Sequence, residues 1–587
     1  MLATPNIPVK NLLPAISRLH EDILIDIFEW NATLDSDSAP LLGTKLDEQK
    51  YKSNALYYAR SASQVSRTWR DAAIGSASVW GKILNLGFLK QGNSFWREEV
   101  LRRTGEAPLE LRAQLFFNDS MKDDAVLPFL ISILNKDWKR IVKIQLAIDD
   151  EEGHALHKIF QNLQKRTSTM LSFDFRLGVS SLEHDISGPL ENLFADNAPF
   201  LLHFSATEIK IPLNTSWITG LRSLHISYNK YCHEANRPTP YSVEETLAAI
   251  GRMSLLEDLR LHRAFTTETP APLPNPIILP HLRSLHLMDD CRSCLAFLSS
   301  IEVPHMNWKI NINLFASTVG QYPEGAWDLM GDIMFKHLQQ YLEVHSISSI
   351  ELRIDDVGLQ LIHTPCPTSS LPGFVFSISD ISPRDYKAFL PQLLSKLSSF
   401  RINEVKSFTL EFGRRNLFPL SEKGFADLLT ALASVETLRT KISVLYNLLE
   451  LRPLLKSCFP SLKILEMDYP DNPSIYTANQ STLPFLSWRT ETGLLQIKML
   501  KLGSVSSWTD TIVSDAVCLD RLKGLKVTWY EPPSEVIHEY SCGSGNAHRL
   551  TFDWFEDVLP ELTEEEREDE GDLSESEIIG TEMLFPY

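Results

Sequence analysis

The chain has 587 residues, a formal net charge of −19, and 43% hydrophobic and 22% charged residues. This length exceeds one small core and favours several domains or one elongated repeat domain. The acidic balance argues against a general nucleic-acid binder, which needs a basic face to release counterions. No stretch approaches the roughly 18 uncharged apolar residues of a membrane span, and the first residues lack the apolar run of a signal peptide. We therefore expect a cytoplasmic or nuclear protein with neither nucleic acid nor membrane as a partner.

Two apolar helices and a third short apolar segment are predicted at the start of the chain. Residues 19–30 place their apolar side chains on one helical stripe, residues 59–74 repeat the helical spacing, and VW follows at 79–80. Residues 33–54 between the helices are rich in Ser, Asp and Lys and are predicted to form a surface loop. So few residues cannot bury this many large side chains among themselves. We expect the remainder to pack on the rest of the chain or on a partner.

These three segments together resemble an F-box. The pattern is carried by LHEDIL at 19–24, QVSRTWRDAA at 64–73 and VW at 79–80, in the order that the family has. His20 and Ser66 stand where the family pattern has proline and cysteine. The long polar insert after the first helix is similar to that of F-box proteins of mushroom-forming fungi.

The resemblance implies two partners: a Skp-family adapter protein and, through it, a cullin. It places adapter binding on apolar residues from all three segments, namely Leu19, Ile23, Leu24, Ile27, Phe28, Val65, Trp69 and Trp80. The open alternative is that three ordinary helices pack into a core of their own.

A short apolar pattern, Leu-x-x-Leu-x-Leu or a close variant, recurs through the rest of the chain. The copies begin at Leu221, Leu256, Leu282, Ile347, Val405, Leu462, Ile497 and Leu522. Helical stretches lie between them, and one of these opens with a capping box, Ser242 to Glu245. Strand and helix in alternation predict parallel strands stacked as in a leucine-rich-repeat solenoid. An ordinary α/β domain whose buried strands look alike stays open as the alternative.

The expected fold class is therefore α/β, with three parts. Residues 1–90 form the F-box domain, with its core at 15–85 and the loop insert at 33–54. Residues 91–555 form the irregular leucine-rich-repeat-like domain. Residues 556–587 form an acidic tail, in which 561–577 hold ten acids and one arginine, and this composition predicts disorder.

No sequence motif for catalysis is present, since HExxH, GxSxG and a phosphate-binding loop are all missing. Only Cys291 and Cys294, among seven scattered cysteines, form a CxxC pair, and the second pair of a zinc ribbon is absent. We predict a non-enzymatic protein without metal or cofactor. A metal at the CxxC pair, and an enzyme whose residues meet only in space, remain alternatives.

The function that the resemblance implies is substrate recognition in an SCF-type (Skp-cullin-F-box) ubiquitin ligase, with the repeats binding a protein target. A scaffold that never assembles into a ligase is the alternative. The residue between the last two apolar positions of each repeat should point away from the core. We therefore predict target contacts at the basic residues found there: His225, Arg260, His286, Lys501 and Lys526. Their charge suggests an acidic or phosphorylated target, and a solvated strand surface without a ligand is the alternative.

Overall fold

The computed structural model describes residues 19–33, 55–89, 94–118, 121–122, 126–150, 153–178, 192–228, 240–266, 276–304, 309–315, 326–355, 358–363, 373–400, 402–413, 423–452, 458–468, 482–504, 514–531 and 536–550. They fall into two compact units. Unit 1 comprises residues up to 346 together with 357–392, and unit 2 comprises 347–356 and the residues from 393 onward. The predicted acidic tail and all but the first residue of the predicted loop insert lie outside the described residues. No described helix is long and apolar enough to cross a membrane.

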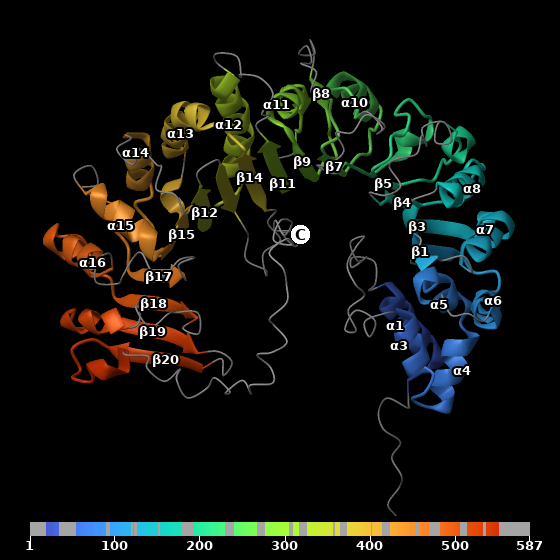
Figure 1. The fold of residues 1–587 in the computed structure, drawn as a ribbon, viewed down its shortest axis with the longest axis horizontal. Helices are drawn as coiled ribbons and strands as arrows, with labels where there is room; N and C mark the ends of the chain where they lie inside the picture. Colours follow the sequence, from blue (N-terminus) through green and yellow to red (C-terminus); the bar gives the residue numbers. More distant parts are fainter. Residues whose placement is uncertain are drawn as a thin grey trace, which may run out of the picture. The chain divides into compact units, whose positions relative to one another are not determined.

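Four described helices open unit 1 and are called here the N-terminal helices: α1 (Glu21–Thr33), α3 (Ala55–Ala62), α4 (Arg67–Gly75) and α5 (Ala77–Lys82). Two acidic residues in the first turn of α1, Glu21 and Asp22, stabilise the positive end of its dipole. Ser66 caps α4, because its hydroxyl accepts the backbone N–H of Trp69 at 3.2 Å. Helix α1 packs against the other three, so these helices share one small core (Figure 1).

The N-terminal helices join the first strand of the repeat region directly. Helix α5 is followed by η3 (Leu86–Phe88) and α6 (Ser94–Arg103), and then by β1 (Leu109–Asn118). The backbone N–H of Arg112 in β1 donates to the carbonyl of Leu84 at 2.9 Å. A Cβ at Gly81 would overlap the carbonyl oxygen of Pro108, so only glycine permits this approach. Helix α5 therefore lies against the beginning of the unit 1 sheet.

Parallel strands in nearly unbroken chain order form the unit 1 sheet. The succession is β1, β3 (Ile141–Asp150), β4 (Ser172–Leu177), β5 (His203–Thr207), β6 (Ser223–Ser227), β7 (Asp258–His262), β9 (Ser284–Asp290), β11 (Lys309–Phe315) and β14 (Phe374–Ser379). Two strands run antiparallel to their neighbours, β2 (Met121–Lys122) beside β1 and β13 (Leu359–His363) beside β14. A separate parallel pair joins β8 (Ile277–Ile278) to β10 (Ile301–Glu302).

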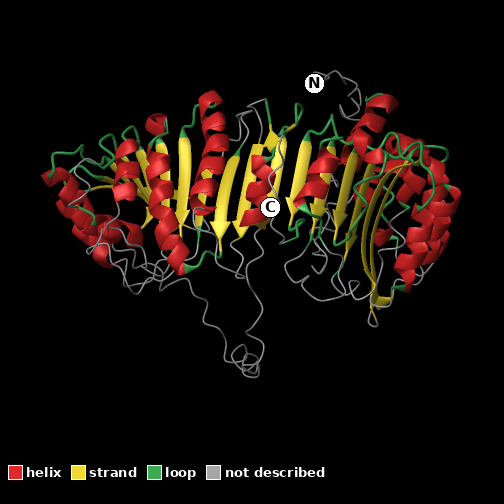
Figure 2. Ribbon diagram, turned by 90° about the horizontal axis from the view of Figure 1, so that it is seen from above, coloured by secondary structure: helices red, strands yellow, loops and turns green. Residues whose placement is uncertain are grey.

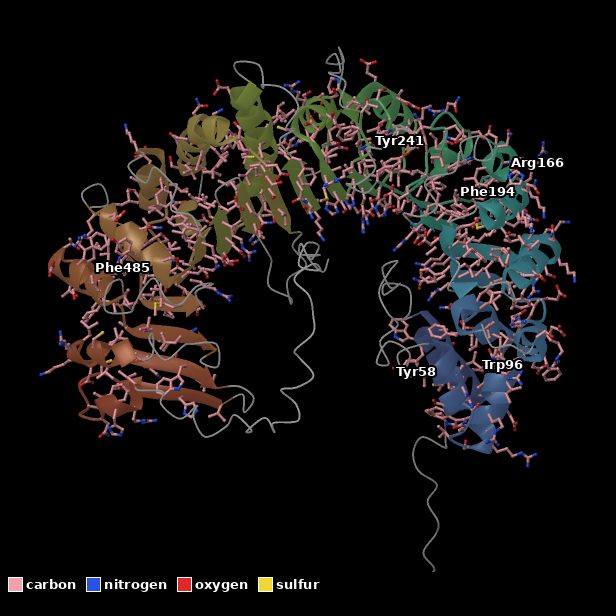
Figure 3. The ribbon with its side chains drawn as sticks, in the orientation of Figure 1. Tyr58, Trp96, Arg166, Phe194, Tyr241 and Phe485 are labelled. Carbon is pink, nitrogen blue, oxygen red and sulfur yellow. The ribbon has the colours of Figure 1, made fainter. Side chains whose placement is uncertain are left out.

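The described helices of the unit 1 repeats cover one face of this sheet (Figures 1 and 2). They are α7 (Val126–Lys136), η4 (Trp138–Arg140), α8 (His154–Leu163), η6 (Leu193–Asp196), η7 (Trp217–Gly220), α10 (Val243–Ile250), α11 (Cys291–Ser299) and α12 (Ala326–Val344). Strand residues alternate, as in β4, where Phe173, Phe175 and Leu177 are buried and the residues between them are half-buried. Phe194 and Tyr241 lie on the helix side (Figure 3). The core therefore lies between helices and sheet, and the opposite side is called here the polar face.

Unit 2 repeats the same plan. Its parallel succession is β12 (Ser349–Ile354), β15 (Ser407–Phe412), β16 (Thr437–Lys441), β17 (Ile464–Asp468), β18 (Met499–Ser504) and β19 (Lys526–Glu531), followed by antiparallel β20 (Val536–Ser541). Its helices are η8 (Ile402–Glu404), α14 (Lys423–Ala431), α15 (Ile442–Glu450), α16 (Thr482–Glu491), η10 (Ser514–Arg521) and η11 (Ala547–Leu550), while α13 (Pro383–Ser398) gives residues to both units. Buried Arg489 on α16 donates to the carbonyls of Cys458 and Phe459 at 2.9 and 3.0 Å.

The predicted repeats are confirmed as strands. Seven of the eight copies of the apolar pattern coincide with strands, namely β6, β7, β9, β12, β15, β17 and β18, and the copy at Leu522 overlaps β19 only from Lys526 onward. The predicted cap is also present, since the hydroxyl of Ser242 accepts the backbone N–H of Glu245 at 3.0 Å. Each unit is a mixed α/β array with a long parallel sheet, resembling a leucine-rich-repeat solenoid. Helices on one face distinguish it from an ordinary α/β domain, which covers both faces of its sheet. The antiparallel strands β13 and β20 were not predicted.

Candidate functional site

An exposed apolar surface runs along α1. Ile23 is 48% exposed, Ile27 is 37% exposed and Trp30 is 72% exposed. Their spacing of four and three residues puts the three side chains on one side of the helix. We call this row the α1 stripe. Val65, before α4, is 58% exposed, and Tyr58 on α3 is also exposed (Figure 3).

The eight residues predicted to bind an adapter separate into three groups. Leu24, Phe28 and Trp80 are buried in the core of the N-terminal helices. Leu19 and Trp69 are half-buried, and Ile23, Ile27 and Val65 are exposed. Only the exposed and half-buried residues can contact a partner. The three buried residues instead stabilise the packing of the helices that present this surface.

Aromatic and polar contacts hold these helices together. The rings of Phe28 and Trp69 meet edge to face with centroids 5.5 Å apart. The indole N–H of Trp80 donates to the carbonyl of Ala73 at 2.8 Å. Lys82 on α5 donates to Glu29 on α1 at 2.6 Å, and this hydrogen bond lowers the pKa of the Glu29 carboxyl. The α1 stripe is therefore presented by a helix tied down at several points.

A second candidate surface is the polar face of unit 1, where three histidines meet. His225 on β6, His262 on β7 and His286 on β9 form a contiguous group that we call the imidazole row. Ring centroids of His225 and His262 are 5.3 Å apart, and those of His262 and His286 are 4.3 Å apart. His262 Nε2 and His286 Nδ1 are hydrogen-bonded at 3.1 Å, and Ser205 Oγ lies 3.3 Å from His225 Nδ1.

The imidazole row is held in the uncharged form. Burial, and after it the charge of Arg260, lower the pKa of His225 and of His286 to about 4. Burial lowers the pKa of His262 to about 3, with His286 as the next cause. Desolvation disfavours the charged imidazolium, and a nearby cation does the same. The row is therefore neutral near pH 7.

The five residues predicted to contact a target do not form one line of free positive charge. His225, Arg260 and His286 are direct neighbours across β6, β7 and β9. Arg260 is 3.1 Å from Asp258. In unit 2, Lys501 is 2.6 Å from Glu466 and Lys526 is 2.6 Å from Glu539. The predicted lysines are thus already neutralised by carboxylates from neighbouring strands.

Lys526 also lies at a different level of its sheet from the one that the pattern predicted. The repeat pattern aligns Lys526 with Lys501, but Lys526 pairs with Met499 and Lys501 pairs with Thr528. Lys526 still faces the polar side, because the shift is an even number of residues. Lys526 therefore lies beside Met499 and not beside Lys501.

No acyl-transfer triad is assembled where serine, histidine and aspartate meet on the polar face. Ser205 lies between Asp174 on β4 and His225 on β6. The carboxylate of Asp174 binds Arg176 at 2.9 Å. A triad needs the carboxylate on the second nitrogen of the histidine that contacts the serine. Asp174 is on the wrong side of Ser205 for that role.

The CxxC pair lies on α11, within the core of unit 1. Cys291 and Cys294 are both buried, and burial raises the pKa of each thiol. Metals bind the thiolate, which burial disfavours here. Within the described ranges, no group of three His, Cys, Asp or Glu side chains could hold a metal ion.

Two residues of these surfaces escaped the prediction. Trp30 is the most exposed member of the α1 stripe, and its spacing from Ile27 is a signal that the sequence does contain. His262 is central in the imidazole row but follows the last leucine of its repeat. The prediction covered only the residue between the last two apolar positions, so it did not include His262. Its neighbours are set by strand register, which the sequence does not display.

No protein-family model and no curated protein matches this sequence. Ten chains of solved structures match. One is the crystal structure of the leucine-rich repeat-containing protein LegL7 from Legionella pneumophila, at 12% identity and a TM-score of 0.25, covering 67% of this chain and 93% of that chain. This likeness is too distant to carry an argument about function.

Proposed function

We propose that the chain is a substrate receptor of an SCF-type ubiquitin ligase. The N-terminal helices bind a Skp-family adapter, the adapter brings a cullin, and the repeat units bind the protein to be modified. The chain itself acts by holding the target near the transfer machinery, so it needs no catalytic residue of its own. Its place of action is the cytoplasm, the nucleus, or both.

The α1 stripe is the observation that carries this proposal. A small helical group with its own buried core also leaves three large apolar side chains 37% to 72% exposed along one helix. Isolated exposed apolar residues are common, but a row at helical spacing is the form in which one helix docks against a partner. The stripe lies in the segment whose sequence resembles an F-box, which supports an adapter as the occupant.

The test is reconstitution with purified proteins. The full chain is mixed with a recombinant Skp-family adapter and its cullin, and the complex is analysed by size-exclusion chromatography with light scattering. We expect one complex that contains all three proteins. A full chain that elutes alone at micromolar concentrations of both partners contradicts the proposal.

A scaffold without ligase assembly is the second candidate. It shares the α1 stripe and the repeat units with the receptor, so the same reconstitution separates the two. Capture of the adapter without the cullin supports the scaffold, and capture of both supports the receptor.

A further inference from the structure

The polar face of unit 1 differs in composition from that of unit 2. On β6, β7, β9 and β11, and directly after β7, it carries the residues His225, Arg260, His262, Arg263, His286, Met288, Asn311, Asn313 and Phe315, together with serines, Asp258, Asp290 and Lys309. The equivalent side of unit 2 carries more acids and lysines, among them Glu351, Glu411, Lys441, Glu466 and Lys501. The centres of protein interfaces are enriched in aromatic residues, methionine and arginine and depleted in lysine and glutamate. The unit 1 set, called here the His–Arg patch, has the composition of an interface centre.

The side chains of the His–Arg patch are also held in place by one another. Besides the contacts within the imidazole row, Asn313 donates to Asn311 at 2.8 Å. The guanidinium of Arg263 lies 4.8 Å from the ring centroid of Phe315. Side chains that are already ordered lose little conformational entropy on binding, which favours affinity. Strands β7, β9 and β11 are adjacent, so the patch is continuous (Figure 1).

Cations outnumber carboxylates around this patch, although the whole chain carries −19. Four cations act on the three imidazoles: Arg176, Arg260, Arg263 and Lys309. Two carboxylates oppose them at the imidazoles, Asp174 and Asp258, and a third, Asp290, lies on the same face in register with Phe315, so these cations outnumber the carboxylates by one. The first two carboxylates already bind arginines, at 2.9 Å for Asp174 and 3.1 Å for Asp258. A ligand whose charge complements this patch is therefore negatively charged.

We propose that the His–Arg patch is the centre of the target-binding site and that it takes a protein segment carrying carboxylate side chains. This inference rests on the proposed function, in which the repeat units bind a target protein. It narrows the target-binding site to one unit and the target to one class of ligand. Lys501 and Lys526 lie in unit 2, outside the patch, where each is bound to a glutamate at 2.6 Å.

Peptide selection on the intact protein tests the proposal. A phage-displayed library of random dodecapeptides is selected on the immobilised full chain, and the selected pool is sequenced. We expect enrichment of Asp and Glu over the starting library. Failure to select peptides, or a pool with no acidic enrichment, overturns the proposal.

Variants then locate the site with one selected peptide. Lys309→Gln removes an exposed cation beside the imidazole row, and Arg260→Gln removes the central one. Each change should weaken binding roughly tenfold, the usual effect of losing a charge-assisted contact. The control, Lys501→Gln with Lys526→Gln, should leave binding unchanged. Equal loss in the control, or no loss in Lys309→Gln and Arg260→Gln, overturns the assignment.

Adapter affinity measured on the same variants keeps the two proposals apart. Peptide binding at the patch in a chain that captures no adapter removes the receptor role and preserves the patch. Adapter capture without acidic peptides does the reverse.

Discussion

Replacing Ile23 and Ile27 by alanine should weaken adapter binding while leaving the N-terminal helices folded. Full burial of an isoleucine side chain contributes about 1.5–3 kcal/mol. Ile23 is 48% exposed and Ile27 is 37% exposed, so each has somewhat less than half of that still to gain. Together they should supply about 2 kcal/mol, and the double variant should bind the adapter about 30-fold more weakly. Alanine is a better helix former than isoleucine, so α1 should not lose stability.

Titration calorimetry of the full chain with the recombinant adapter measures the dissociation constant, and hydrogen exchange measures the local stability of α1. Leu24→Ala is the control for a loss of helix stability. Leu24 is 1% exposed, so its truncation should lower the free energy of unfolding of the N-terminal helices by about 2–5 kcal/mol. Leu171→Ala controls for exposed leucines elsewhere, since Leu171 is 44% exposed but lies in the repeat region, and adapter affinity should not change. Adapter affinity within threefold of wild type in the double variant, with exchange in α1 unaltered, would refute docking by the α1 stripe.

Three further outcomes are expected. Gly81→Val should destabilise α5 and the start of β1 by about 1–3 kcal/mol, because the valine side chain has no room beside Pro108. Gly75→Ala should not destabilise them, because Gly75 has open space around it. Hydrogen exchange measures both effects. Acid should destabilise unit 1: the folded pKa values of His225, His262 and His286 are about 4, 3 and 4, below the ordinary 6.5, so stability present above pH 6.5 falls as the pH drops toward 4. Denaturant midpoints at several pH values should show this slope, and it should flatten in His262→Asn. Deleting residues 561–577 should leave the thermal midpoint within a degree or so of wild type, since it removes almost no apolar area.

The strands could be predicted because burial on one face forces a period of two, and that period is visible in one sequence. Parallel pairing of successive strands followed from the helices between them. The antiparallel strands β13 and β20 carry no such signal, since a hairpin partner and a crossover partner show the same alternation.

The split of the adapter-binding residues could not be predicted for a different reason. A helix with apolar residues around much of its circumference has no unique phase, so Leu24 and Ile23 are equivalent in sequence. Packing of α1 against α3, α4 and α5 decides between them, and buries Leu24 to 1% exposure while leaving Ile23 at 48%. Ion pairs such as Lys501 with Glu466 were hidden in the same way, because their members are 35 residues apart.

The register of β19, which contains Lys526, is not determined by the hydrophobic pattern. Alignment of the repeats sets Val527 opposite Leu502, yet Val527 pairs with Leu500, two residues earlier. Gly524, at a φ of +88°, turns the chain just before β19. A slip of one residue would turn Val527 away from the core, whereas a slip of two leaves every apolar side chain buried. The hydrophobic pattern therefore determines which face a residue occupies but not which residue lies beside it. Predictions of single contacts across a repeat surface need the register, and predictions of its buried face do not.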